Sequence, residues 1–429
     1  MSKAKKMIEW GKTALIVLLT VSALLLGWQT GIFNDFLLTL PVFGSVAGLM
    51  GGGTGTAMSS GTVLKEAARP LSIVITNEEG ERYGIKYDVD ERNATYERTR
   101  RLFTEAFGSA SVPQEISEEQ WRESLGGAGV FFEYATPIRL SVLDKWLGAQ
   151  MPETMQDLYL RRMFVAFGED RSRLYYQDHS SSLFYGTDTV SSAGKAQELE
   201  NFVSNGAVFA YETGITGAEN APYMLLIPGS YHPNIRAYAA GSPDELLAYG
   251  LTALGHVNEL YRTYFGPDNT LVCVGTQFRI MMQTDGRLWY RRTDGLPSQE
   301  LLPSLSKSEM IEAARMIVFD SISAVSGNAE VFFESYEQAG DVLHVHFGYF
   351  IAGGRVHMYD DRHAAMITFT SGIVTEVDLN FRNFIFSGEY TRLLPERQTL
   401  AAAGNEFMLY YSDTGAEILH PSWVKSTSL

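Results

Sequence analysis

The sequence contains a single cysteine, Cys273, so no disulfide can form within the chain. A secreted scaffold held together by disulfides is therefore excluded. Cys273 lies in the apolar run Leu271–Val274, which is typical of a strand. A thiol in such a run behaves as a small hydrophobic side chain, and we expect it to be buried rather than reactive.

Basic residues are scarce. Lys and Arg number 34 against 50 Asp and Glu, and the formal net charge is −16. Nucleic-acid binding needs clustered Lys and Arg to contact phosphates, so a nucleic-acid partner is excluded. The hydrophobic content of 45% is that of a folded protein, and 429 residues suit two or three domains.

Motifs for catalysis are also missing. The sequence has no HExxH, GxSxG or CxxC. The GGGTG run at residues 51–55 lacks the Gly-Lys-Ser/Thr that completes a phosphate-binding P-loop. It also lacks the strand and helix that flank a dinucleotide-binding loop. We therefore predict neither an enzyme nor a cofactor.

The closest pair of histidines is His344 and His346, which share one face of a predicted strand. Two such rings could begin a zinc site. Further possible donors are Asp360, Asp361 and His363. The alternate positions 343, 345 and 347 are apolar and supply the core, so we expect both histidines to face solvent and to bind no metal.

Charge is absent from Thr13 to Ile32, a run of 20 residues. At 1.5 Å per residue this helix would be about 30 Å long, the thickness of a bilayer core. Residues 1–12 carry four lysines, and no basic residue follows the run until Lys65. The positive-inside rule then predicts a cytoplasmic tail at 1–12, a transmembrane helix at 13–32 and an exterior outside the cytoplasm.

A cleaved signal peptide is the alternative, because the most apolar part, Ala14–Gly27, is short. The sequence after it, Gly27-Trp28-Gln29, is a poor cleavage site, which favours an uncleaved anchor. Within the anchor, Thr20, Ser22, Ala23 and Gly27 are small residues that could form a contact face for another membrane helix. The alternative is that the helix only tethers the exterior.

The exterior is predicted to be an α+β fold of antiparallel sheets with packed helices. We expect a flexible Gly-rich tether at 33–62, an N-terminal α+β domain at 63–205, a middle module at 206–300 and a C-terminal module at 301–429. In the N-terminal domain, residues 77–80 predict a hairpin turn and residues 91–107 a helix. Ser117 and Gln120 predict a capped helix start.

An approximate repeat follows. Ser242 with Glu245, and Ser306 with Glu309, are capping boxes that predict two helices. Their apolar stripes include Leu247, Leu251, Leu254 and Tyr261 in the first helix region. Strands are expected after each helix, so 240–300 and 305–390 are predicted to share one topology. At the end of the chain a short helix from Leu394 to Ala403 precedes a strand at 407–411 and the segment Ile418–Trp423.

Several segments resemble YycH, the membrane-anchored regulator of the YycFG (WalKR) two-component system, and its relative YycI. The segments are the basic N-terminus with the single helix and Trp28, Ala68–Ile75, Gly129–Ile138, and the closing helix and strand with Pro421-Ser-Trp423. The resemblance implies a bacterial membrane protein without catalytic residues. It also implies PepSY-like modules, and partners that are a sensor histidine kinase, a YycI-like membrane protein and the membrane bilayer.

Two other functions remain open from the residues alone. An extracytoplasmic ligand-binding surface protein would need a deep apolar pocket with few polar groups. A cell-wall hydrolase would need convergent acid and base groups in a pocket.

Overall fold

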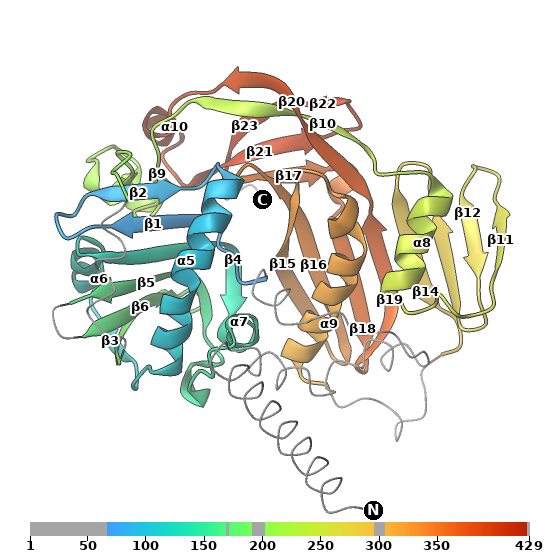
Figure 1. The fold of residues 1–429 in the computed structure, drawn as a ribbon, viewed down its shortest axis with the longest axis horizontal. Helices are drawn as coiled ribbons and strands as arrows, with labels where there is room; N and C mark the ends of the chain where they lie inside the picture. The colour runs from blue at the N-terminus through green and yellow to red at the C-terminus, as the bar shows by residue number, and fades with distance from the viewer. Residues whose placement is uncertain (1–66, 169–170, 191–201, 296–304, 427–429) are drawn as a thin grey trace, which may run out of the picture.

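The fold is α+β, as the sequence predicts, and consists of mainly antiparallel sheets with packed helices (Figure 1). The computed structural model describes residues 67–168, 171–190, 202–295 and 305–426. The expected membrane helix at 13–32 and the tether at 33–62 lie outside these ranges. Within them, no helix has both the length and the apolar character required to cross a bilayer.

The N-terminal sheet has seven antiparallel strands in the order β2-β1-β4-β5-β6-β7-β3. Its strands are β1 (Ser72–Thr76), β2 (Arg82–Ile85), β3 (Gln114–Ile116), β4 (Gly129–Arg139), β5 (Tyr159–Phe167), β6 (Ser172–Asp178) and β7 (Phe184–Thr189). Its helices are α5 (Val89–Gly108), α6 (Glu118–Leu125) and α7 (Leu140–Leu147). The hairpin expected at 77–80 joins β1 to β2 and is confirmed.

Local capping explains where these helices begin. The Asp88 side chain accepts a hydrogen bond from the amide of Glu91 at the start of α5. The predicted capping box of Ser117 and Gln120 opens α6 and is confirmed. Helix α5 then packs its apolar side on the sheet, where the rings of Phe103 and Phe132 stack with centroids 3.9 Å apart.

The second large sheet has eleven strands, ordered β11-β12-β13-β14-β19-β18-β16-β17-β21-β23 with β15 beside β16. Its strands are β11 (Arg262–Phe265), β12 (Leu271–Val274), β13 (Phe278–Met282), β14 (Arg287–Arg292), β15 (Glu330–Ala339), β16 (Val342–Ile351), β17 (Gly354–Met358), β18 (Ala365–Thr370), β19 (Ile373–Asn380), β21 (Phe407–Asp413) and β23 (Pro421–Lys425). Helices α8 (Pro243–Ala253) and α9 (Lys307–Asp320) lie on one face of it (Figure 1).

A helix followed by a four-stranded antiparallel meander occurs twice in this region. Helix α8 precedes β11 to β14, and helix α9 precedes β15, β16, β18 and β19. The last strands of the two meanders, β14 and β19, pair with each other, so the meanders run toward one another across one sheet. Both predicted capping boxes, at Ser242 and at Ser306, are confirmed.

One detail differs from the sequence prediction. The apolar stripe assigned to α8 ends with the helix, and Tyr261 is instead 43% exposed beyond it. Cys273 is buried as expected, and burial raises the pKa of its thiol to about 11.

The C-terminal segment contributes strands to the large sheet and to a third, smaller sheet. Strand β21 is parallel to β17, and β23 pairs with β21. Helix α10 (Glu396–Ala403) precedes β21 and ends at Gly404, which has a φ of 63°. A third sheet, β20-β10-β22, lies above the large one (Figure 1). Its strands are β10 (Tyr231–Ala239), β20 (Arg382–Arg392) and β22 (Ile418–Leu419), and a short pair joins β8 (Val208–Phe209) to β9 (Leu225–Leu226).

One hydrophobic core runs through most of the described chain. It includes side chains from Ala68 in the N-terminal region to Leu419 near the C-terminus. Pairing also crosses the predicted boundary at 300, because β10 pairs with β20 and β14 with β19. The division into modules at 206–300 and 301–429 stays a prediction, and the structure shows that these regions share sheets and core.

The conformation of Gly286 predicts that a larger residue at this position destabilises the fold. Gly286 has a φ of 95° in the turn before β14, and a Cβ there would lie 2.4 Å from the carbonyl oxygen of Phe381. We expect Gly286→Ala to lower the free energy of unfolding by about 2–4 kcal/mol, since it adds a backbone clash to left-handed strain. Urea denaturation of the full-length chain, followed by tryptophan fluorescence, measures the change.

Gly415 is the matched control. Its φ is 87°, but no atom lies within 4 Å of the corresponding Cβ. Gly415→Ala should therefore cost only about 1 kcal/mol, from backbone strain alone. Equal effects of the two substitutions would contradict the proposed contact with Phe381.

Candidate functional site

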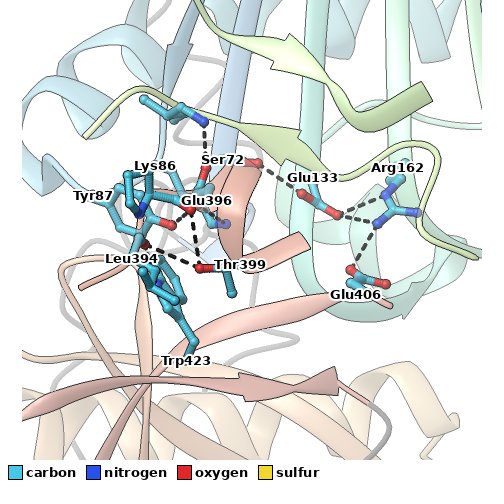
Figure 2. A network of polar contacts seen from close by, with 12 residues as sticks. Ser72, Lys86, Tyr87, Glu133, Arg162, Leu394, Glu396, Thr399, Glu406 and Trp423 are labelled. Atoms are coloured by element: carbon cyan, nitrogen blue, oxygen red, sulfur yellow. Dashed lines mark hydrogen bonds and ion pairs between the residues drawn. The ribbon is translucent and has the colours of Figure 1, made fainter. Parts of the chain in front are cut away.

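The N-terminal sheet meets the C-terminal segment at a buried polar contact, which we call the junction (Figure 2). Its residues are Ser72, Lys86, Tyr87, Glu133, Arg161, Arg162, Glu396 and Glu406. The first six come from strands β1, β4 and β5 and from the end of β2. The two remaining carboxylates belong to α10 and to the connection before β21.

One row of side chains across three strands forms the first half of the junction. Ser72, Glu133 and Arg162 are direct cross-strand neighbours on β1, β4 and β5. The Ser72 hydroxyl donates to Glu133 Oε2 at 3.2 Å, and Arg162 Nε donates to Glu133 Oε1 at 2.8 Å. The row is therefore hydrogen-bonded along its length, as buried charged groups require.

Two consecutive arginines reach the same carboxylate. Arg161 donates to Glu406 Oε1 at 2.5 Å and to Oε2 at 3.3 Å, and Arg162 donates to Oε1 at 3.1 Å. Successive side chains of a regular strand point to opposite faces. The pairing of β5 with β6 shifts register between Leu160 and Met163, and this irregularity lets both guanidinium groups lie on the side of Glu406.

The charges set the protonation state of Glu406. Burial by itself would raise the pKa of this carboxyl, but Arg161 and Arg162 outweigh burial and lower the pKa to about 2. Glu406 is therefore ionised at neutral pH. Its charge, together with that of Glu133, balances the two arginines.

Glu396 forms the second half of the junction. It is only 2% exposed and lies in the first turn of α10, where the helix dipole favours a negative charge. Its Oε1 accepts hydrogen bonds from the Tyr87 hydroxyl and from Lys86 Nζ, the latter at 3.5 Å. Its Oε2 accepts from the amide of Ile227 at 2.5 Å. One carboxylate thus ties β2, α10 and the segment after β9 together.

Aromatic rings enclose the histidine next to this carboxylate. The His232 ring lies edge-on to Tyr87 and to Trp423, with centroid distances of 4.7 and 5.2 Å. Trp423 Nε1 donates to the carbonyl of Leu394 at 2.9 Å (Figure 2). Burial, with a smaller effect of Lys86, lowers the pKa of His232 to about 4, so the ring is neutral at pH 7.

Two neighbouring cavities adjoin the junction. One of about 240 Å³ is lined by Lys86, Tyr87, His232 and Glu396 among others. The other, of about 440 Å³, shares residues 227–230 and Glu396 with it. Polar and charged side chains make up much of the first lining, and Lys86 and Glu396 among them are buried and paired with each other. This differs from the deep apolar pocket that a ligand-binding surface protein would need.

A second contact joins the same units on the side of α9. Arg92 of α5 forms an ion pair with Glu330 of β15. Trp146 Nε1 of α7 donates to Glu312 Oε2 of α9 at 2.9 Å, and Arg315 Nε donates to the same oxygen at 2.8 Å. The N-terminal sheet is therefore held at two separate places, which fixes its orientation on the large sheet.

The expectation that both strand histidines face solvent is wrong for His346. The two rings do lie on the face opposite the helices, but His346 is only 8% exposed. Its ring lies 4.3 Å from that of His363, whose Nδ1 lies 2.8 Å from Glu334 Oε2. Burial, with a smaller effect of His363, lowers the pKa of His346 to about 4.

A register irregularity at Glu334 explains this burial. The pairing of β15 with β16 shifts between Phe333 and Ser335, so the carboxylate of Glu334 lies over Gly348. His344 is half-buried and contacts Thr368 Oγ1 at 3.0 Å. In the part of the chain that the structure describes, no three His, Cys, Asp or Glu side chains are placed to hold a metal ion.

The junction was not predicted from the sequence. The residues predicted to form a helix-contact face, Thr20, Ser22, Ala23 and Gly27, lie outside the described residues. In the junction, Glu133 and Glu396 are buried. The available signal was a charge inside an apolar strand: Glu133 in VFFEYA and the Arg161–Arg162 pair in YLRRMFV.

Comparison with known proteins supports the fold. No protein-family model and no curated protein matches this sequence. The structure is similar to the crystal structure of YycH from Bacillus subtilis, with a TM-score of 0.52 and 12% sequence identity. The match covers 84% of this chain and 94% of that chain. The resemblance found in the sequence is thus confirmed at the level of the fold.

The lowered pKa of Glu406 at the junction makes the stability of the fold depend on pH. Because the folded pKa of Glu406 is below its ordinary value, this carboxylate stabilises the fold above about pH 4.5. The contribution is lost as the pH falls toward 2. We expect Glu406→Gln to lower the free energy of unfolding at pH 7 by about 2–3 kcal/mol, since one arginine charge loses its partner.

Urea denaturation at pH 7, 5, 4 and 3 measures the free energy of unfolding and tests this contribution of Glu406. The difference between the native chain and Glu406→Gln should shrink below about pH 5 and be roughly halved by about pH 3. Glu417→Gln changes an exposed carboxylate of the same C-terminal segment and should be near neutral throughout. A difference for Glu406→Gln that stays constant down to pH 3 would rule out the assigned role.

Proposed function

We propose that this chain is a membrane-anchored extracytoplasmic regulator that modulates a sensor histidine kinase of a two-component system through protein contacts. The fold shared with YycH over most of both chains carries this proposal. The proposed location is the bacterial cell membrane, with residues 1–12 in the cytoplasm and the bulk of the chain outside. The proposed partners are the kinase, a YycI-like membrane protein and the bilayer.

The architecture is suited to such a role. A regulator beside a kinase needs an exterior whose orientation relative to its anchor is defined. The described chain begins at Ala67, five residues before β1, and β1 carries Ser72 of the junction row. The chain that arrives from the anchor is therefore fixed to Glu133 and Arg162, and through Glu406 to the large sheet.

The chemistry of the junction favours a structural role over catalysis. Its carboxylates are engaged by arginine, lysine and tyrosine side chains, and Glu406 has a lowered rather than a raised pKa. A general acid requires the opposite shift. We therefore propose a regulator that is not an enzyme, and we propose that its two helix-and-meander units are PepSY-like modules.

The anchor is proposed to make part of the contact. Helices in a bilayer associate through close packing of small residues rather than through hydrophobicity. Thr20, Ser22, Ala23 and Gly27 offer such a face in the sequence, within the proposed helix at 13–32. The partner face would belong to a helix of the kinase or of the YycI-like protein.

Replacing this face should change kinase output. We expect the triple change Thr20→Leu, Ala23→Leu and Gly27→Leu to alter a kinase-dependent reporter by a factor of about two or more, since single polar contacts between helices in a bilayer are worth about 0.6 kcal/mol on average. Deletion of the exterior beyond residue 62 should alter it as well. Reporter activity in cells, normalised to the membrane level of each variant, is the measurement.

The control changes Leu18→Ile and Leu25→Ile, which lie on the side of the same predicted helix opposite Thr20, Ala23 and Gly27. It should leave output unchanged. If only the exterior deletion has an effect, the helix is a tether and the contact face is wrong. The regulator hypothesis itself is wrong if kinase output is unaltered by the triple substitution, by deletion of the exterior and by an exchange of residues 13–32 for an unrelated anchor.

A further inference from the structure

The large sheet ends at an open edge. Strand β11, Arg262–Phe265, is the first in the strand order and pairs only with β12 among the described strands. All four of its residues are exposed. It lies at the end of the sheet beyond α8 (Figure 1). An exposed edge strand is a template for pairing with another chain.

The hairpin geometry shows which backbone groups face this edge. The amide of Gly266 donates to the carbonyl of Thr270 at 2.8 Å, so these residues form a hydrogen-bonded pair. In an antiparallel ladder such pairs recur at every second residue. Tyr264 therefore directs its backbone groups toward β12, whereas Thr263 and Phe265 direct theirs outward. The edge offers two amides and two carbonyls to an incoming strand.

Apolar side chains concentrate around the same strand. Of the 18 large hydrophobic side chains that are exposed in the described chain, six lie between residues 257 and 274. They are Val257, Leu260, Tyr261, Tyr264, Phe265 and Val274. Leu260 is 92% exposed and Phe265 62%. Clustering of this kind marks an interaction surface, whereas single exposed apolar residues need no explanation.

A row of arginines begins at the edge. Arg262, Val274, Arg279 and Arg291 are successive cross-strand neighbours on β11 to β14. Arg291 lies 3.4 Å from Glu376, but Arg262 and Arg279 are exposed and have no ion-pair partner among the described residues. In a chain with a net charge of −16, two exposed arginines of one cross-strand row without a carboxylate form an unusual basic site.

From these features we infer that β11 is a docking edge for an extended, acidic segment of a partner protein. The segment adds as a strand beside β11 and bonds to the outward backbone groups of Thr263 and Phe265. Its carboxylates lie on the face of Arg262 and Arg279. Its apolar side chains lie on the other face, beside Phe265. The partner sequence therefore alternates acidic and apolar residues.

Charge argues against a second copy of this chain at the same edge. Pairing of two β11 strands about a two-fold axis perpendicular to the sheet would put both arginine rows on one face of a continuous sheet. Like charges that face one another across strands are destabilising. An acidic segment instead neutralises the row.

The inference deepens the proposed function and rests on it for the partner, a protein of the kinase system. Its test needs no kinase. Dye-labelled peptides of about eight residues, one alternating glutamate with valine and one alternating lysine with valine, are titrated with the full-length chain in nonionic detergent. Fluorescence anisotropy reports binding. The glutamate peptide should bind at least about tenfold more tightly than the lysine peptide, because a glutamate beside Arg262 gains an ion pair where a lysine is repelled.

Two variants separate the charge from the backbone. The double change Arg262→Glu and Arg279→Glu should invert the preference, so that the lysine peptide binds better, a gain that misfolding cannot produce. Thr263→Pro removes one outward amide and should weaken binding of the glutamate peptide by about tenfold. Thr263→Val keeps that amide and should bind like the native chain.

Equal binding of both peptides, or an unchanged preference after charge reversal, would overturn the inference. So would a dimer in analytical ultracentrifugation that Thr263→Pro dissociates, because a second copy would then occupy the edge. Loss of peptide preference while kinase output still depends on the exterior refutes the docking edge alone. Unchanged output after deletion of the exterior refutes the proposed function alone.

Discussion

The charges of Arg161, which is half-buried, and of Arg162, which is buried, impose the main constraint on this molecule. Moving a guanidinium group out of water costs several kcal/mol unless a carboxylate and hydrogen bonds replace the lost hydration. The N-terminal sheet supplies one carboxylate, Glu133, for two arginines. The second, Glu406, is 245 positions beyond Arg161 in the sequence. The N-terminal sheet therefore completes its charge balance only when the C-terminal segment is in place. An incorrectly oriented arrangement would leave a charge unpaired, so the network selects one orientation as well as stabilising it.

The strand order explains how the end of the chain reaches this position. The second meander ends in β19, and β20 then crosses the molecule beside β10. Strand β20 thereby places α10 next to β2, where Glu396 is hydrogen-bonded to Lys86 and Tyr87. Strand β21 next enters the large sheet parallel to β17, the one parallel pairing among the described strands of that sheet. The C-terminal segment thus belongs at once to the large sheet and to the junction. Its hydrogen bonds join regions that the sequence predicts to be separate modules.

What the sequence could predict depended on the range of the interactions. The capping boxes at Ser242 and Ser306 and the hairpin at 77–80 involve groups three or four residues apart, and their positions were predicted correctly. The junction was not predicted because the ion pairs that link its two halves join residues hundreds of positions apart, as Lys86 and Glu396 do. The burial of His346 was not predicted from the sequence for a different reason. Alternation placed its ring on the correct face, but a register irregularity brings Glu334 over that face, and no periodicity encodes such a shift.

The junction and the docking edge lie at opposite ends of one hydrogen-bonded sheet, which runs in strand order from β11 to β23. A sheet with helices packed on one face transmits a displacement instead of absorbing it, because close-packed interiors are difficult to compress. The large sheet meets the N-terminal unit at the junction, where Glu406 engages β5 and, through Arg162 and Glu133, the strand β1. Under the proposed function, a partner strand bound at β11 would act on the rest of the exterior through this contact. Its binding would matter only by favouring one arrangement of the proposed kinase over another, since a protein contact shifts an equilibrium only through its different affinity for the two states.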